Sequence, residues 1–180
     1  SNPTMTTPQF STTPVAWDDA LLLDLKPMDD DHQEIVALLA EVVRADDDYL
    51  MPRWSALIAG MQRHFDEEDR WMQDTGFAAD NCHSSQHKII LQILREGEAR
   101  GHNGQHDVVR QMAYELGVWL PHHVEAMDSS LVIHLRSVGF DPVTRTVPNG
   151  YQATTESIHG CGGSTCGDTA TATAGEVTPA

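Results

Sequence analysis

The sequence has few basic residues and no long apolar run, and each shortage excludes a class of function. Only 11 Lys and Arg stand against 27 Asp and Glu in 180 residues, which gives a formal net charge of −16. Such a surface repels phosphate backbones and anionic lipid head groups, so we expect neither nucleic-acid nor membrane-surface binding. No apolar stretch reaches the roughly 18 to 20 residues that cross a bilayer. The N-terminal residues also lack the basic segment and apolar core of a secretory signal, which predicts a cytoplasmic protein.

Cysteine is equally scarce, and its pattern is not that of a disulfide-stabilised secreted domain. The three cysteines, Cys82, Cys161 and Cys166, are odd in number and have no framework-like spacing. Cys82 adjoins His83, but a soft thiolate would select zinc or copper, so Cys82 is interpreted as structural. Cys161 and Cys166 match neither a zinc ribbon nor a CxxC redox motif, and their role stays open.

Composition divides the chain into a central domain and two polar ends. Residues 1–16 are rich in Thr, Pro and Ser and predict a flexible N-terminal arm. Residues 17–140 have the length of one domain with a sizeable core. Thr, Gly, Ala and Pro dominate from residue 141 onward, so residues 141–180 are predicted to form a disordered, low-complexity tail.

Apolar residues recur at helical spacing in four central segments, which predicts an all-α domain. The expected helices cover about residues 29–46, 52–76, 84–100 and 108–138. Pro52 can open the second helix, because proline is tolerated at the first helical position. Gly76, Gly101 and Gly139 are expected to end the second, third and fourth helices, with a turn over residues 101–105.

Five histidines and two carboxylates recur along these helices at spacings that suit a metal centre. They are His32, His64, Glu68, His83, His87, His123 and Asp128. Residues three or four apart lie on one helix face, so His64 with Glu68, like His83 with His87, can direct two donor atoms to one point. Each pair alone is a weak signal, but the groups fall on four separate helical segments. Seven ligands are too many for one ion and suit two.

His123 and Asp128 do not fit the same-face pattern. They are five residues apart, which leaves them about 140° out of phase at 3.6 residues per turn. Either the two side chains reach the site from different edges of the helix, or a local widening such as a π-bulge brings them together.

The donor types favour iron. Imidazole and carboxylate donors suit this metal, and bridging carboxylates hold two ions roughly 3.5 to 4 Å apart. Ferritin-like di-iron oxidases use more carboxylates, whereas the neutral donors here disfavour high-valent iron and fit reversible binding better than oxygenation. Apolar residues near the ligands are candidates for a ligand pocket, and they are Ile35, Phe65, Trp119, Leu120 and Val124.

Four motifs resemble those of bacterial hemerythrins. They are M-D-x-x-H at residues 28–32, H-F-x-x-E at 64–68, HxxxH at 83–87 and W-L-x-x-H-V-x-x-x-D at 119–128. The resemblance spans about residues 17–140 and implies an up-down-up-down antiparallel four-helix bundle. It also implies an oxo- or hydroxo-bridged centre of two iron ions.

The resemblance further implies how the ligands are shared. His83, His87 and His123 would bind one iron, and His32 and His64 would bind the other. Glu68 and Asp128 would bridge the two ions. The second iron would keep an open position for dioxygen or another small diatomic ligand.

Three functional hypotheses follow. The first is a non-catalytic protein that binds dioxygen reversibly for storage, delivery or sensing. The second is a di-iron redox enzyme that acts on peroxide or nitric oxide, which needs the same seven ligands and differs in solvent access and turnover. The third is a metal-free helical interaction domain in which the histidines are incidental.

Overall fold

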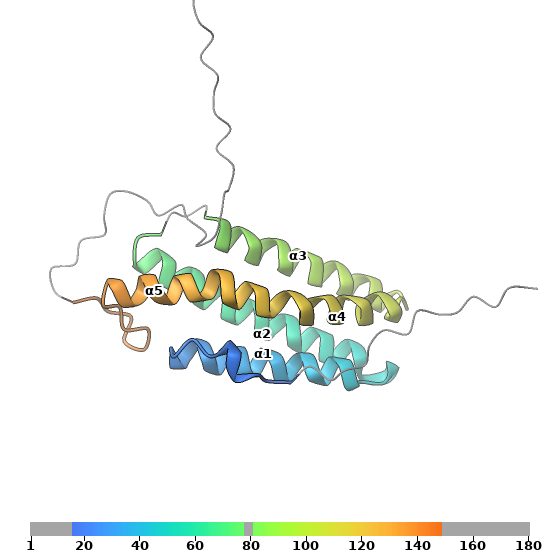
Figure 1. Ribbon diagram of the computed structural model, residues 1–180. Helices are drawn as coiled ribbons and strands as arrows, with labels where there is room; N and C mark the ends of the chain where they lie inside the picture. Colours follow the sequence, from blue (N-terminus) through green and yellow to red (C-terminus); the bar gives the residue numbers. More distant parts are fainter. Residues whose placement is uncertain (1–15, 78–80, 149–180) are drawn as a thin grey trace, which may run out of the picture.

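The computed structural model describes residues 16–77 and 81–148, and its regular elements are helices (Figure 1). A short 3-10 helix, η1 (Asp19–Leu21), precedes α1 (Lys26–Arg44), α2 (Asp47–Asp74) and α3 (Cys82–His102). The last helical rod consists of α4 (His106–His123), the π-helical turn η2 (Val124–Asp128) and α5 (Ser129–Ser137). Nearly all of the predicted arm and most of the predicted tail lie outside the described residues.

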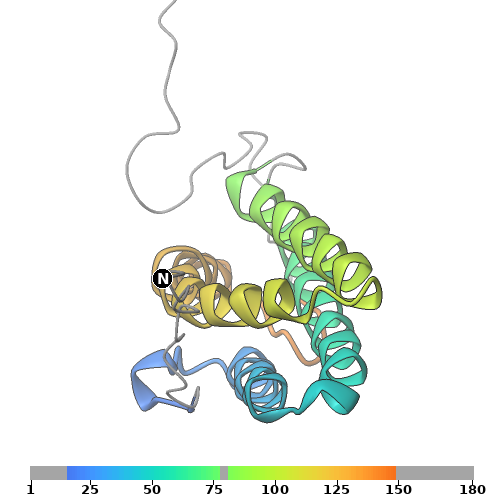
Figure 2. The ribbon, with the colours of Figure 1, turned by 90° about the vertical axis from the view of Figure 1, so that its right-hand side faces the viewer.

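The helices form an all-α bundle, which confirms the predicted fold class. Short connections over residues 45–46 and 103–105 join α1 to α2 and α3 to α4, and such links place consecutive helices antiparallel. Helix α1 packs against α2 and α4, and α3 packs against α2 and α4. Figure 2 shows the four rods around a common interior. None of the helices in residues 16–77 and 81–148 is both long and apolar enough to span a membrane.

Helix α2 begins five residues before the predicted start at Pro52. The Asp46 side chain caps the helix by accepting a hydrogen bond from the Tyr49 backbone N–H. Asp47 and Asp48 then place negative charge at the positive end of the helix dipole. These signals outweigh the single backbone hydrogen bond that Pro52 removes inside the helix.

Gly101 does not end α3, contrary to the sequence-based expectation. The helix continues to His102, and the turn residue with positive φ is Gly104, at φ +84°. Gly101 is buried instead, because its missing side chain lets α3 approach Met51 and Val109 closely. The predicted stops at Gly76 and Gly139 are confirmed, since both have positive φ just beyond α2 and α5.

The buried apolar residues form two clusters with a polar layer between them. The large cluster includes Leu39, Trp54, Leu57, Leu94 and Leu116. The small cluster consists of Met28, Trp71, Met72, Leu131, Val132, Leu135 and Phe140. Along α2, Phe65 belongs to the large cluster and Trp71 to the small one, with buried Glu68 between them. The candidate ligands therefore lie inside the bundle, away from its ends.

Replacing Gly101 by alanine should destabilise the bundle. A Cβ at this position would lie 2.8 Å from Cγ2 of the stiff, buried Val109 and also against Met51. Overpacking of this kind typically costs about 1 to 3 kcal/mol, and the better helix propensity of alanine offsets at most about 1 kcal/mol. Thermal unfolding of Gly101→Ala measures the loss.

Gly60→Ala is the matched control, because its Cβ would meet only the terminal Cδ1 of Leu38, at 2.6 Å. That methyl group can rotate away, so Gly60→Ala should unfold close to the parent. If Gly101→Ala is as stable as Gly60→Ala, the close approach of α3 to Val109 does not constrain the fold.

Candidate metal centre

The structure brings the seven candidate ligands into one buried layer of the bundle. His32 lies on α1, His64 and Glu68 on α2, and His83 and His87 in the first turns of α3. The α3 turns are fixed by Asn81, whose side chain caps the helix by accepting from the Ser84 N–H at 2.9 Å. His123 ends α4, and Asp128 ends η2. None of the seven is more than 4% exposed.

Their donor atoms form two groups that share both carboxylates. One group contains Glu68, His83, His87, His123 and Asp128, and the other contains His32, His64, Glu68 and Asp128. Within each group the ligand atoms lie within 4.8 Å of one another. Every sequence-predicted metal ligand therefore belongs to at least one group.

The two oxygens of Asp128 face different groups. Oδ1 lies 2.9 Å from Nε2 of His83 and 3.1 Å from Nε2 of His123. Oδ2 lies 3.0 Å from Nε2 of His32. The Asp128 carboxylate therefore points one oxygen to each donor group.

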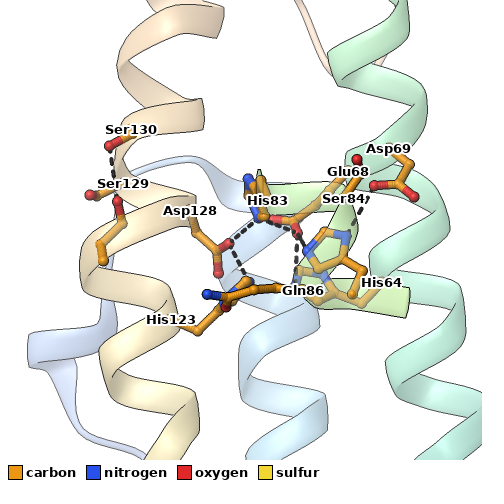
Figure 3. A network of polar contacts seen from close by, with 12 residues as sticks. His64, Glu68, Asp69, His83, Ser84, Gln86, His123, Asp128, Ser129 and Ser130 are labelled. Carbon is orange, nitrogen blue, oxygen red and sulfur yellow. Dashed lines mark hydrogen bonds and ion pairs between the residues drawn. The ribbon is translucent and has the colours of Figure 1, made fainter. Parts of the chain in front are cut away.

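Glu68 also contacts histidines of both groups, in this case through a single oxygen. Its Oε2 lies 3.2 Å from Nε2 of His87 and 3.5 Å from Nε2 of His83. The same oxygen is 3.6 Å from Nε2 of His64. Figure 3 shows Glu68 and Asp128 converging on the histidines from α2 and from the last rod.

The π-helical turn explains how His123 and Asp128 meet across five residues. The wider turn places the Ser129 N–H against the Val124 carbonyl, five residues back. The Ser129 hydroxyl donates to the Glu125 carbonyl, and the Ser130 hydroxyl donates to the Ala126 carbonyl at 3.0 Å. Of the two explanations that the sequence left open, the local widening is the one observed.

The electrostatics of the layer concentrate negative charge on the two carboxylates. Burial opposes the charged form of His64, but the Glu68 charge and the Asp31 contact outweigh it and raise the pKa of His64 to about 9. Burial likewise opposes the charged form of His83, but contacts with Asp128 and Glu68 raise the pKa of His83 to about 10. Burial would raise the pKa of both carboxyls, yet the surrounding histidines hold the pKa of Glu68 and of Asp128 below the usual range.

The inward polar atoms of this layer face one another in ion-pair contacts but make no hydrogen bonds with the described residues. Within the described part of the chain, the inward Nε2 atoms of all five histidines and both oxygens of each carboxylate lack a hydrogen-bond partner. Buried polar groups without partners are strongly unfavourable and rare. A cation that accepts these lone pairs would satisfy them together, so the residues fit a metal site.

Three histidines have a polar contact at their outer ring nitrogen, and sequence reasoning did not find these contacts. Nδ1 of His87 lies 3.0 Å from Oδ1 of Asp69, and Nδ1 of His123 lies 3.1 Å from Oε1 of Gln86. Nδ1 of His64 lies 3.5 Å from Oδ2 of Asp31. The two hydrogen-bonding partners, Asp69 and Gln86, fix their rings so that the opposite nitrogen would face a metal, whereas Asp31 makes only a longer ion-pair contact. The sequence held no signal for them, because acidic and amide residues are frequent on every solvent-exposed helix face.

The candidate pocket residues all lie at or near the same layer. The Phe65 ring stacks on His87 with centroids 4.0 Å apart, and the Trp119 ring stacks on His123 at 4.4 Å. Ile35, Leu120 and Val124 are buried in the large cluster, one to four residues from a candidate ligand. Trp119 is partly buried against this cluster.

A four-helix bundle with a buried layer of histidines and carboxylates defines a helical metal-binding domain. Comparisons with known proteins agree with this class. Residues 24–133 match the family model of the hemerythrin HHE cation binding domain. The chain belongs to the hemerythrin family.

A curated relative supports the same assignment. The chain is 31% identical over 127 residues to a bacteriohemerythrin from Ralstonia nicotianae, and the aligned region covers 71% of this chain and 93% of that protein. No solved structure matches the chain significantly.

Proposed function

We propose that this chain is a non-heme di-iron protein that binds dioxygen reversibly, for storage, delivery or sensing. The observation that carries the proposal is the pair of donor groups that share Glu68 and Asp128. His83, His87 and His123 would hold one iron, and His32 and His64 would hold the other. Membership of a cation-binding family and similarity to a bacteriohemerythrin support iron as the metal.

The donor sets differ by one histidine, and this difference indicates where a small ligand would bind. Three histidines and two carboxylates surround one position, whereas two histidines and the same two carboxylates surround the other. An iron pair held by these residues would supply the electrons that dioxygen binding requires, and the position beside His32 and His64, which has one histidine fewer, would be the one to accept the ligand. The apolar side chains of Ile35, Phe65, Leu120 and Val124, which are buried close to the candidate ligands, would exclude water and protons from the layer.

Metal analysis and gas titration test the proposal. Protein grown with iron should contain about two irons per chain, as in other two-metal sites. The reduced protein should gain a visible absorption band in air and lose that band under inert gas.

Two outcomes would contradict the proposal. A reproducible value near one metal per chain, or zinc under iron-replete growth, would contradict the di-iron assignment. A parent that never shows the reversible band but consumes peroxide or nitric oxide repeatedly would be the redox enzyme instead.

Leu120→Ala should keep its iron but autoxidise faster than the parent. Leu120 is buried in the large cluster three residues before His123, so its truncation opens the apolar wall to water. A barrier lowered by about 1.4 kcal/mol gives about tenfold faster autoxidation. The rate is measured on the reduced protein in air-saturated buffer, well below its unfolding temperature.

Val118→Ala is the matched control on the same helix, because Val118 is 51% exposed. It should autoxidise at the parent rate. Equal rates for the two variants would show that the Leu120 side chain does not protect the site.

A further inference from the structure

Asp69 contacts the outer nitrogen of a candidate iron ligand. Its Oδ1 lies 3.0 Å from Nδ1 of His87, with hydrogen-bond geometry. The other ring nitrogen, Nε2, lies 3.2 Å from Glu68 on the inner side. When Nε2 is a metal ligand, the ring proton is on Nδ1, and the Nδ1–H donates to the Asp69 carboxylate.

This contact differs from the other outer contacts of the layer. Gln86, the partner of His123, is a neutral amide. Asp31 approaches His64 at 3.5 Å without hydrogen-bond geometry, so Nδ1 of His64 has no hydrogen-bond partner among the described residues. Among the outer contacts described for residues 16–77 and 81–148, the one between Asp69 and His87 is therefore the hydrogen bond that involves a carboxylate.

The negative charge of Asp69 acts on His87 without a competing cation. No Lys or Arg of the described residues forms an ion pair with Asp69, and the adjacent Arg70 pairs with Glu67 instead. The Asp69 side chain is 28% exposed, whereas that of His87 is 1% exposed. The interaction therefore reaches from the surface of α2 into the desolvated layer, where charges act more strongly than in water.

Two contacts together fix the His87 ring. Phe65 stacks on it with an interplanar angle of 6° and so restrains the plane of the ring. Stacking alone permits a half-turn of the ring about its Cβ–Cγ bond, which keeps the ring plane but exchanges the positions of its nitrogen and carbon atoms. The hydrogen bond to Asp69 selects the orientation in which Nε2 faces the other donors.

We propose that Asp69 is a positioning residue for His87 and that its charge favours the oxidised state of the iron that His87 would hold. This inference rests on the proposed di-iron function. A carboxylate on the outer nitrogen makes the imidazole a stronger donor. A stronger donor stabilises the more highly charged metal ion.

Three variants separate positioning, charge and general surface effects. Asp69→Asn keeps an acceptor oxygen but removes the charge, and Asp69→Ala removes both. Asp66→Asn is the matched control, because Asp66 lies on the same helix, is exposed, and bonds to Gln62 rather than to a histidine. Asp66→Asn and Asp69→Asn change the net charge by the same amount.

Two readouts are needed, and neither is ligand-binding activity. The first is retention of added iron(II) against a competing chelator, measured anaerobically. The second is the midpoint potential of the iron-loaded protein in a mediated redox titration. Asp69→Ala should lose about 10- to 100-fold in iron affinity. Asp69→Asn should retain more of that affinity yet show a midpoint potential shifted to more positive values, whereas Asp66→Asn should match the parent in both.

The outcomes distinguish this inference from the proposed function. If the parent binds about two irons but both Asp69 variants behave like Asp66→Asn, the role of Asp69 is wrong and the di-iron proposal stands. If the parent binds no iron pair, both the proposed di-iron function and the role of Asp69 are wrong. If Asp69→Ala does not fold, the midpoint potential of Asp69→Asn still tests the role of Asp69, because an unchanged potential would contradict it.

Discussion

Glu68→Ala is expected to lose most of its iron. Oε2 of Glu68 lies within 3.6 Å of Nε2 atoms on three histidines, and these histidines belong to both donor groups. In the proposed di-iron centre, removing this side chain would take a donor from each metal position at once and leave Asp128 as the one shared carboxylate. Iron per chain, measured after identical loading and desalting, should fall from about two to below one.

Glu67→Ala is the control for this experiment. Glu67 is the preceding residue and carries the same charge, but it is partly exposed and pairs with Arg70 on the helix surface. It should retain the iron content of the parent. If Glu68→Ala also retains that content, Glu68 is not a bridging ligand, and the site needs a different assignment.

Removal of iron should lower the unfolding temperature markedly. Without a cation, the layer keeps a set of buried nitrogen and oxygen atoms that have no hydrogen-bond partner among the described residues. A ligand present at about 1,000 times its Kd adds about 4 kcal/mol to stability. For a domain of this size, that gain corresponds to a shift on the order of 16 °C in the unfolding midpoint.

The comparison is made by differential scanning calorimetry of the iron-loaded protein and of the same sample after chelation and dialysis. Glu68→Ala treated in the same way serves as the control, because it should show little change on chelation. Identical midpoints for the loaded and chelated parent would show that the metal contributes nothing to folding stability.

Much of this fold could be predicted from the sequence, because the controlling signals are local. The spacing of apolar residues indicates the four rods, and pairs such as His83 with His87 lie on one face of any regular helix. The structure then brings all seven candidate ligands together. Their role as iron ligands stays a prediction.

What the sequence could not provide depends on which helix faces oppose one another. Asp69 meets His87 across α2 and α3, and Gln86 meets His123 across α3 and α4. Gly101 carries the local signal of a helix end, but packing against Val109 overrides it. The five-residue spacing of His123 and Asp128 indicated that a regular helix was insufficient, yet both the widened turn and a two-edge arrangement were compatible with it.

The polar layer that separates the two apolar clusters has a consequence for cooperativity. In each of α1, α2 and the last rod, residues of the small cluster and of the large cluster are joined through the layer of candidate ligands. A cation in the layer would couple the two clusters into one unfolding unit. Without it, the small cluster around Trp71, Leu131 and Phe140 holds few apolar groups and should open on its own, as a local unfolding event. Amide hydrogen exchange in α5 would then be fast in the metal-free protein, whereas exchange at the centre of α2 would still report global unfolding.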